Sequence, residues 1–518
     1  MKRNMQAWVL LLVFTMIAGM IPSGSVTEAS HVPQVKLGNE VLLSSQMHLV
    51  KGKRVGLVTN QTGVNGQGKS LVDVFAEHPE INLVALYAPE HGIDGKAKAG
   101  AYVESTVHPT LGIPIYSLYG QTRKPSPAMM AGVDVLVFDM QDVGSRTYTY
   151  MSTMNYCMVA AKENNKPIVI LDRPNPVGGL IVEAPVMEDK FISFVGIDNL
   201  PMAHGMTAGE LALFFNRKIG ANVTVVKMEG YTRDMIWQDT GLTWVQTSPN
   251  IPTIESAFGY MATGLGEGTG IYMGDKFQWI GGKGINANAF AELLNKSGLP
   301  GVTFVPELMN GVGGVRLNIT DYRTFNPARS GFFALAYAKQ LTNFTVPKSG
   351  STIVMFDKIM GTDKVGQWLD QRLTPQQILA NYTPALNKFK EERKQYLIYG
   401  SATDSIRVRV SGVQVHFDAE PYIDTQNRVM VPLRAIGEAL DSYVHWNPST
   451  REVTVRKDGK IVVLTVGSRR VLVDGQEFFM DTVPVIKNGR TMIPVRFISE
   501  YQGARVDWDS VTKTVNIN

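Results

Sequence analysis

The chain has 518 residues, of which 44% are hydrophobic and 19% are charged, and its formal net charge is +4. A chain of this length and composition can bury several ordinary cores, which excludes an intrinsically disordered protein and a protein built mainly of membrane spans. The small excess of positive charge is not the footprint of a nucleic-acid-binding protein, so we expect no nucleic-acid partner. The single cysteine excludes an internal disulfide.

The first 29 residues have the pattern of a secretory signal peptide. Lys2 and Arg3 precede an apolar run from Ala7 to Ile21, and small residues suited to cleavage follow at 27–29. The apolar run is shorter than the ~20 residues that a membrane-spanning helix needs. We therefore expect an exported protein, secreted or associated with the cell wall. Its mature chain would start near Ser30 and have no integral membrane span.

Between about residues 35 and 222, short apolar runs alternate with stretches of helical character. Near-continuous apolar strands separated by helices indicate a parallel sheet with helices on both faces. We predict an α/β region at 30–222, a smaller α+β region at 223–400 and a linker at 401–405. The apolar runs are Arg54–Thr59, Leu83–Tyr87, Val133–Phe138 and Pro167–Leu171.

The sequence repeats itself near its C-terminal end. The segment Val429–Ile436 matches Thr491–Ile498, and each copy is followed at the same distance by a tryptophan, Trp446 or Trp508. Two copies in register indicate a duplicated module. We predict a small, β-rich, duplicated domain at residues 406–518.

Polar residues follow the carboxyl ends of all four predicted strands, where ligands bind in parallel α/β sheets. An acid at one strand end is usual, because acids also cap helices, but several on one edge favour a binding site. Carboxyls supply acid and base, arginine fixes an anionic substituent, and tyrosine rings stack on sugars, so the set suits a sugar site. The residues are Asn60 and Gln61; Glu90 and His91; Asp139, Gln141, Asp142, Arg146, Tyr148 and Tyr150; and Asp172, Arg173 and Asn175.

Glu210 has a structural and a functional interpretation. Thr207 and Glu210 form a Thr-x-x-Glu capping box before an apolar helix, which favours a cap over a catalyst. His204 precedes this cap and is as often a turn residue as a ligand. The eight histidines have no metal-ligand spacing, so we expect no metal.

Two glycine-rich segments suggest alternatives. Gly63–Ser70 fits the phosphate-binding pattern G-x-x-x-x-G-K-[ST], and Val135–Asp139 could be its magnesium-binding strand. Nucleotides are scarce outside the membrane, and three residues separate the first strand from the loop, so a nucleotide-binding enzyme is the weaker hypothesis. Gly264–Gly270 departs from G-x-G-x-x-G at Thr269, and within it Glu267 could contact a ligand.

In order along residues 35–400, the chain resembles the NamZ-type exo-β-N-acetylmuramidases. The resemblance implies a Rossmann-like subdomain joined to a smaller one, with the site in the cleft between them. It also implies hydrolytic release of N-acetylmuramic acid from the non-reducing end of peptidoglycan fragments, without a cofactor. The matching segments are Pro89–Gly92, Tyr116–Gly120, Phe138–Tyr150, Leu171–Pro176, His204–Glu210, Ser248–Asn250 and Glu267–Thr269.

The resemblance implies roles for the polar residues. Glu90 would be the general acid or base, with Asp139, Asp142 or Glu267 as second carboxylate or water-positioning group. Arg146 and Arg173 would clamp the lactyl carboxylate of muramic acid through bidentate hydrogen bonds. Further substrate contacts are expected from Asn60, His91, Gln141, Tyr148, Tyr150, Asp172, Asn175, His204, Glu210, Ser248 and Asn250.

Two features extend or depart from the family pattern. Where family members continue with a Gly-Arg-Gly-Thr segment, residues 270–279 lack that arginine and threonine, so a non-catalytic muropeptide-binding protein is an alternative. The C-terminal repeat resembles the small N-terminal domain of some copper amine oxidases. Only His416 and His445 lie in it, too few for a copper site. Attachment to the cell wall and a plain structural stalk are both open hypotheses for the role of this domain.

Overall fold

The structure, a computed structural model, describes residues 35–401 and 406–518, except for 416, 418, 488, 502 and 510–512. The expected signal peptide at 1–29 and most of the expected linker at 401–405 lie outside the described residues. Within the described ranges, no helix combines the length and the apolar character that crossing a membrane requires.

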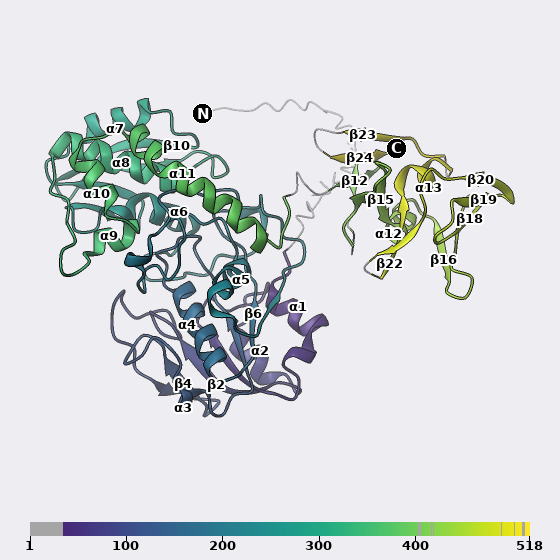
Figure 1. Cartoon of the computed structure of the whole chain (residues 1–518), viewed down its shortest axis with the longest axis horizontal. Coiled ribbons are helices and arrows are strands. Elements are labelled where there is room, and N and C mark those ends of the chain that lie inside the picture. Colours follow the sequence, from purple (N-terminus) through teal and green to yellow (C-terminus); the bar gives the residue numbers. More distant parts are fainter. Residues whose placement is uncertain are drawn as a thin grey trace, which may run out of the picture. The chain divides into compact units, whose positions relative to one another are not determined.

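Seven strands form the first sheet, in the order β3-β4-β2-β1-β5-β6-β7 (Figure 1). All neighbouring pairs are parallel except β3 with β4. The winding of the chain reverses beside β1, as in doubly wound nucleotide-binding folds, so the predicted parallel α/β sheet is confirmed. The strands are β1 Arg54–Thr59, β2 Asn82–Ala88, β3 Thr106–Val107, β4 Pro114–Ser117, β5 Val135–Asp139, β6 Ile168–Leu171 and β7 Val223–Val226. Because β7 pairs with β6, this sheet extends past residue 222, where the sequence suggested a boundary.

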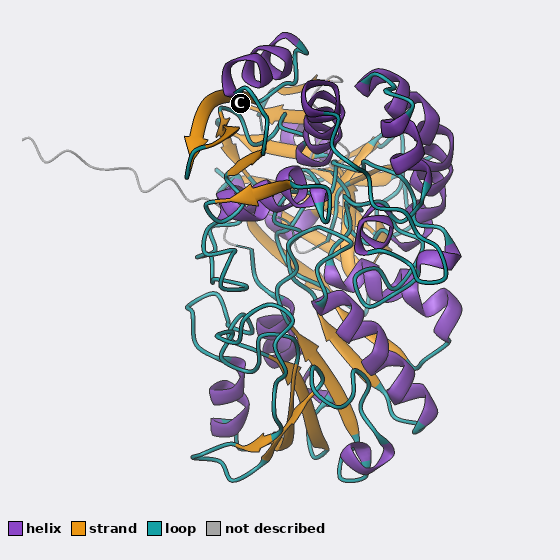
Figure 2. Cartoon of the chain, turned by 90° about the vertical axis from the view of Figure 1, so that its left-hand side faces the viewer, coloured by secondary structure: helices purple, strands orange, loops and turns teal. Residues whose placement is uncertain are grey.

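Helices cover both faces of this sheet (Figure 2). α1 (Gly38–Ser45) and α2 (Leu71–Glu77) share one apolar core with alternate strand residues such as Val135 and Val137. α4 (Tyr150–Glu163) and α5 (Ala208–Ile219) share the other core with the intervening residues, such as Leu136 and Phe138. α3 (Pro127–Met130) contributes Met130 to this second core. Each strand is therefore buried on both faces, which explains its near-continuous apolar sequence.

A second, antiparallel sheet follows in the order β10-β11-β9-β8. Its core is continuous with that beneath α4 and α5, so the α/β and α+β regions share one apolar interior. The strands are β8 Ile271–Gly274, β9 Trp279–Gly282, β10 Val302–Met309 and β11 Val312–Ile319. The helices are α6 Ile254–Thr263, α7 Ala287–Lys296, α8 Pro327–Thr342, α9 Met355–Met360, α10 Lys364–Asp370 and α11 Pro375–Arg393.

The C-terminal residues form a domain of three small sheets with a core of its own, as the repeat predicted. At its centre β15 pairs antiparallel with β22 through repeat-related residues, with Val431 opposite Ile493, so the two repeats face each other. The strands are β12 Arg407–Val410, β13 Val413–Gln414, β14 Tyr422–Ile423, β15 Val429–Pro432, β16 Tyr443–Asn447, β17 Glu452–Lys457, β18 Lys460–Thr465, β19 Arg470–Val473, β20 Gln476–Phe479, β21 Val485–Lys487, β22 Arg490–Pro494, β23 Val506–Asp509 and β24 Thr514–Ile517. Helices α12 (Leu433–Ala439) and α13 (Val495–Tyr501) follow β15 and β22.

Candidate active site

Glu90 follows the carboxyl end of β2 and is held by hydrogen bonds from two different segments. Its Oε1 accepts the Gly100 amide at 2.8 Å, and its Oε2 accepts the Thr149 hydroxyl at 2.6 Å. Tyr119 lies near enough that burial, together with the charge of Glu90, raises the pKa of Tyr119 to about 12. Glu90 is 7% exposed, so its carboxylate is oriented by the protein without being fully sealed.

The segment between β5 and α4 connects Glu90 to the rest of the site. Beside Thr149, the Thr147 hydroxyl lies 3.0 Å from the hydroxyl of Tyr260 on α6. The Tyr150 hydroxyl donates to the Thr247 carbonyl at 2.6 Å. These bonds join the loop after β5 to the region that follows the first sheet, so the orientation of Glu90 depends on both.

Aromatic rings form a chain through this segment. Tyr148 meets Tyr150 edge to face at a centroid distance of 4.7 Å and Tyr260 at 6.0 Å, and the His91 ring meets Tyr150 at 6.4 Å. Burial raises the pKa of Tyr148 and Tyr150 well above the usual tyrosine range. The residues 270–279, which depart from the family pattern, form the β8–β9 hairpin, and its Phe277 packs edge to face on Tyr260 at 5.0 Å. The altered segment therefore supports a ring of the candidate site.

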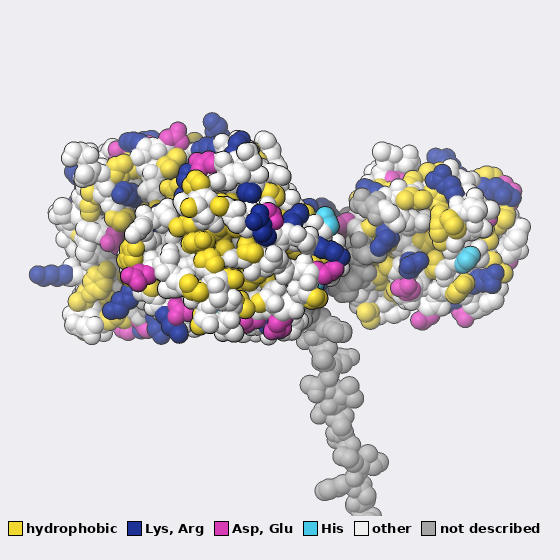
Figure 3. All heavy atoms as spheres, turned by 90° about the horizontal axis from the view of Figure 1, so that it is seen from below, with side chains coloured by type: hydrophobic (Ala, Val, Ile, Leu, Met, Phe, Trp, Pro, Cys, Tyr) yellow, Lys and Arg dark blue, Asp and Glu magenta, His cyan; other side chains and the backbone are white. Residues whose placement is uncertain are grey.

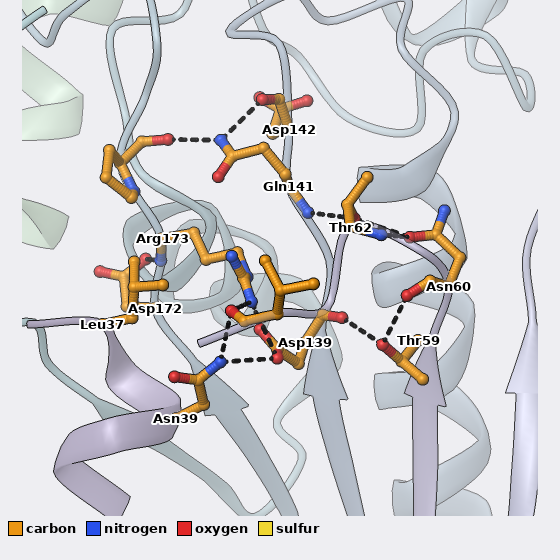
Figure 4. A network of polar contacts seen from close by, with 12 residues as sticks. Leu37, Asn39, Thr59, Asn60, Thr62, Asp139, Gln141, Asp142, Asp172 and Arg173 are labelled. Atoms are coloured by element: carbon orange, nitrogen blue, oxygen red, sulfur yellow. Dashed lines mark hydrogen bonds and ion pairs between the residues drawn. The ribbon is translucent and has the colours of Figure 1, made fainter. Parts of the chain in front are cut away.

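Asp139 and Arg173 form a buried ion pair (Figure 4). Asp139 Oδ1 accepts Arg173 Nε at 2.5 Å, and Oδ2 accepts Arg173 Nη2 at 3.0 Å and Asn39 Nδ2 at 3.1 Å. Arg173 also donates to the Val64 carbonyl at 2.6 Å, and the two side chains are 0% and 3% exposed. Asp139 and Arg173 are therefore each other's partners inside the protein, and their predicted roles as catalyst and substrate clamp stay predictions.

Asp172 connects the end of β6 to the start of α5. It is fully buried and accepts hydrogen bonds from the Arg173 and Gly209 amides at 2.9 and 2.7 Å and from the Thr207 and Tyr399 hydroxyls at 2.8 and 2.7 Å. Burial outweighs these donors and raises the pKa of Asp172 to about 7. Asp172 therefore holds β6 to the start of α5, and its predicted contact with substrate stays a prediction.

Glu210 completes the predicted capping box of α5. Its carboxylate accepts the Thr207 amide, while the Thr207 hydroxyl accepts the Glu210 amide. The same carboxylate pairs with Arg233 and accepts the Ile398 amide at 2.9 Å, and Glu210 is 0% exposed. The capping interpretation is confirmed, and the expected contact with substrate is corrected.

Asp142, Arg146 and His204 lie below the surface. Arg146 is 4% exposed and donates to the carbonyls of Lys358 and Ile359, so it joins the sheet to α9 and is not free to clamp a substrate anion. His204 Nε2 lies 3.3 Å from Asp142 Oδ2. The other oxygen of Asp142 has no hydrogen-bond partner among the described residues, so this carboxylate keeps one free acceptor.

The other candidates fall into a buried group and an exposed group. Asn60, Gln141, Asn175 and Ser248 are at most 5% exposed. Asn60 Oδ1 accepts from Thr62, Gln141 Nε2 donates to the Asp142 and Pro174 carbonyls, and Asn175 bonds to Met206 and Val177, so these amides hold the loops in place. Asn250 and Glu267 are exposed, and within the described ranges neither of them forms a hydrogen bond with Glu90.

Two site residues, Arg123 and Phe194, were missed by sequence reasoning. The Arg123 guanidinium lies 3.6 Å from the ring centroid of Tyr119 and 4.9 Å from that of Phe194. Phe194 in turn stacks on Tyr156 at 6.0 Å with an interplanar angle of 11°. All four side chains are partly exposed. A half-exposed cluster of rings and one cation therefore lies near Glu90.

The glycine-rich loop before α2 does not have the arrangement of a phosphate site. The Gln67 and Lys69 amides donate to the Asn65 side chain, and the Lys69 ammonium pairs with Glu77. The Ser70 hydroxyl caps α2 itself. The loop therefore satisfies its own donors, which removes the basis of the nucleotide-binding hypothesis.

With this geometry in place, the comparisons with known proteins identify the family. Residues 55–255 match the family described as exo-beta-N-acetylmuramidase NamZ, N-terminal, and residues 258–399 match its C-terminal counterpart. The chain belongs to the NamZ exo-β-N-acetylmuramidase family. Residues 409–517 match the copper amine oxidase N-terminal domain.

Individual relatives agree with this assignment. The chain is 42% identical over 414 residues to the peptidoglycan beta-N-acetylmuramidase NamZ of Bacillus subtilis (strain 168), covering 75% of this chain and 99% of the relative. Crystal structures of two DUF1343 family proteins from Bacteroides fragilis NCTC 9343 each cover 71% of this chain and 99% of their own. They match with TM-scores of 0.64 and 0.55 at 36% and 29% identity.

The buried ion pair generates a prediction about stability. Arg173→Met leaves the Asp139 carboxylate buried without its cation, so we expect the free energy of unfolding to fall by about 3–5 kcal/mol. The matched control is Lys296→Met, which removes the exposed partner of Glu292 and should cost about 0–1 kcal/mol. Urea unfolding of the full chain measures both changes, and equal small losses would contradict the structural role of the pair.

Asp172 generates a prediction about pH. Its folded pKa of about 7 lies above the usual aspartate value, so between about pH 4 and pH 7 the folded state holds more protons than the unfolded state. This contribution to stability is full at low pH and is lost as the pH rises through 7, by at most about 1.4 kcal/mol per pH unit. The difference in unfolding free energy between the native chain and Asp172→Asn should therefore change from pH 4.5 to 7 and level off above 8. A difference in unfolding free energy that stays constant over the whole pH range would contradict the raised pKa of Asp172.

Proposed function

We propose that the chain is an exo-acting β-N-acetylmuramidase that releases N-acetylmuramic acid from the non-reducing end of peptidoglycan fragments. The observation that carries the proposal is the state of Glu90. It is oriented by Gly100 and Thr149, forms no ion pair with a cation of the described residues, and lies beside a half-exposed group of rings. Membership of the NamZ family supports the same chemistry.

In this proposal Glu90 donates a proton to the glycosidic oxygen or takes a proton from the attacking water. The Thr149 and Gly100 donors fix the carboxyl in one orientation, as efficient proton transfer requires. The Tyr119 and Phe194 rings provide apolar faces on which a sugar ring can stack.

Asp142 is our candidate for the second carboxylate. Both Glu90 and Asp142 act on the Tyr260 hydroxyl, whose pKa is raised to about 12 mainly by burial and further by these two charges. Asp142 also keeps one oxygen without a hydrogen-bond partner among the described residues. Asp139 is the weaker candidate for this role, because it is paired with Arg173.

We assign recognition of the lactyl carboxylate to Arg123 instead of Arg146 and Arg173. Arg123 stacks on Tyr119, which lies near Glu90, and among the described residues Arg123 forms no ion pair with a carboxylate. A partly exposed guanidinium beside the acid suits a planar anion, which it can bind with two parallel hydrogen bonds. The lactyl group distinguishes muramic acid from glucosamine, so this contact would set substrate preference.

We further propose that the protein acts outside the cytoplasm. The charged and apolar pattern of residues 1–29 supports export, and the C-terminal domain would attach the enzyme to the cell wall. Both statements agree with a peptidoglycan substrate.

The role of Glu90 is tested by replacing it with glutamine. Glu90→Gln should lower kcat on a chromogenic N-acetylmuramic acid glycoside by roughly 10²–10⁴-fold, because the amide cannot transfer the proton. Glu292→Gln, a surface change on α7, should leave turnover as it is. Full activity of Glu90→Gln would remove this residue from the mechanism. Tight binding of a muramic acid–glucosamine disaccharide by the native chain without turnover would favour the non-catalytic alternative.

The role of Arg123 is tested by comparing two substrates. In Arg123→Met, KM for the muramic acid glycoside should rise about 10–100-fold, the effect of losing charge-assisted hydrogen bonds. The corresponding N-acetylglucosaminide has no lactyl carboxylate, so its kcat/KM should change less than twofold, as should both substrates in the exposed control Arg372→Met. Equal losses on the two substrates would show that Arg123 only supports the Tyr119 ring.

A further inference from the structure

The C-terminal domain contains two pockets in equivalent positions. The first has a volume of about 360 Å³ and is lined by Pro432, Arg434, Trp446 and Arg490, among others. The second has a volume of about 320 Å³ and is lined by Pro494, Arg496, Trp508 and Arg428, among others. Each pocket therefore combines one tryptophan with two arginines.

The equivalence follows from the sequence repeat. Arg434 and Arg496, Trp446 and Trp508, and Arg428 and Arg490 are each separated by the spacing from Pro432 to Pro494. The two arginines of the third pair each line the pocket of the opposite repeat. Arg490 lines the pocket that contains Trp446, and Arg428 lines the pocket that contains Trp508. The exchange is possible because β15 and β22 pair antiparallel at the centre of the domain. Duplication has thus produced two copies of one site, each built from both repeats.

The surfaces of the pockets are accessible to a ligand. Trp508 is 37% exposed, and an exposed isoleucine borders each pocket, Ile486 at 50% in the first and Ile423 at 47% in the second. The space-filling view shows apolar side chains among Lys and Arg side chains on one face of the C-terminal domain (Figure 3). Exposed apolar surface inside a hollow is typical of a binding site.

The charges of the pockets favour an anion. Arg434 and Arg496 are exposed at the start of α12 and α13, and Arg496 approaches Glu500 at 3.8 Å. The lining of the second pocket contains no acid, although its Arg428 pairs with Asp481 outside the lining, and the lining of the first contains only Glu438. A tryptophan face binds the apolar side of a pyranose ring, while a guanidinium binds a carboxylate.

We propose that these two pockets bind an acidic polysaccharide, with one carboxylate-bearing sugar unit in each. Two equal, individually weak sites in one rigid domain suit a polymer that repeats the same unit, because binding at the first raises the effective concentration at the second. The inference deepens the proposed attachment to the cell wall and depends on it only for the source of the polysaccharide, which would be the peptidoglycan glycan strand at units whose stem peptide has been removed, where the lactyl carboxylate is free.

The test measures binding of the full chain to purified peptidoglycan sacculi from which teichoic acids have been removed and whose lactyl carboxylates have been freed by partial amidase cleavage of the stem peptides. The double variant Arg434→Gln with Arg496→Gln changes two exposed side chains and should lower affinity at least about tenfold. Trp446→Ala with Trp508→Ala, which removes both stacking faces, should lower it by about 10² or more. The charge-matched control, Arg451→Gln with Arg456→Gln, changes exposed arginines outside both pockets and should bind as the native chain does.

The outcomes separate this inference from the proposed enzyme activity. Turnover of the soluble chromogenic glycoside should be the same in the native chain and all three double variants, so a loss of wall binding alone supports the pockets. Unchanged binding in the arginine variant would overturn the proposal and leave a plain stalk. The proposal would also be overturned if the native chain bound only walls that still carry teichoic acids. A change in the oligomeric state of the variants, with sacculus binding intact, would overturn it as well.

Discussion

The buried ion pair between Asp139 and Arg173 is the interaction on which the candidate site depends. It lies where β5 and β6 end, and with Asn39 and the Val64 carbonyl it joins the two strands to α1 and to the loop after β1. The chain that leaves β5 at this point carries Thr147, which meets Tyr260, and Thr149, which orients Glu90. The loop that orients Glu90 therefore starts at an almost fully buried ion pair.

The same constraint explains why so few of the polar strand ends are available to a substrate. A carboxylate in an apolar interior must be paired or hydrogen-bonded, and the structure does this for Asp139, Asp172 and Glu210 with partners of its own. Like Asp172, Glu90 has neutral donors as partners, but Glu90 is 7% exposed whereas Asp172 is fully buried. Arg123 differs from the buried Arg146 and Arg173 because it is partly exposed and rests on aromatic rings. Glu90 and Arg123 are therefore proposed for function because they lack a counter-charge among the described residues and are also open to solvent.

The sequence predicted what local patterns determine and missed what tertiary contacts determine. Continuous apolar strands, the capping box at Glu210 and the C-terminal repeat are local signals, and the structure contains all three. β7 was assigned to the next region because its pairing with β6 comes after a long helix. The Asp139–Arg173 pair spans 34 residues, and Arg123 and Phe194 meet from separate loops, so neither contact leaves a periodic or spacing signal. The paired pockets, in contrast, lie within repeat motifs already visible in the sequence.

The central claim is that a muramic acid residue binds with its glycosidic oxygen at Glu90 and its lactyl carboxylate at Arg123. The most direct measurement is a crystal structure of Glu90→Gln with the muramic acid–glucosamine disaccharide bound. We expect the side chain of residue 90 within about 3 Å of the glycosidic oxygen, the lactyl group at the Arg123 guanidinium and a sugar ring against Tyr119. A disaccharide bound elsewhere, or one whose glycosidic oxygen lies beyond the reach of residue 90 or of one bridging water, would contradict the account.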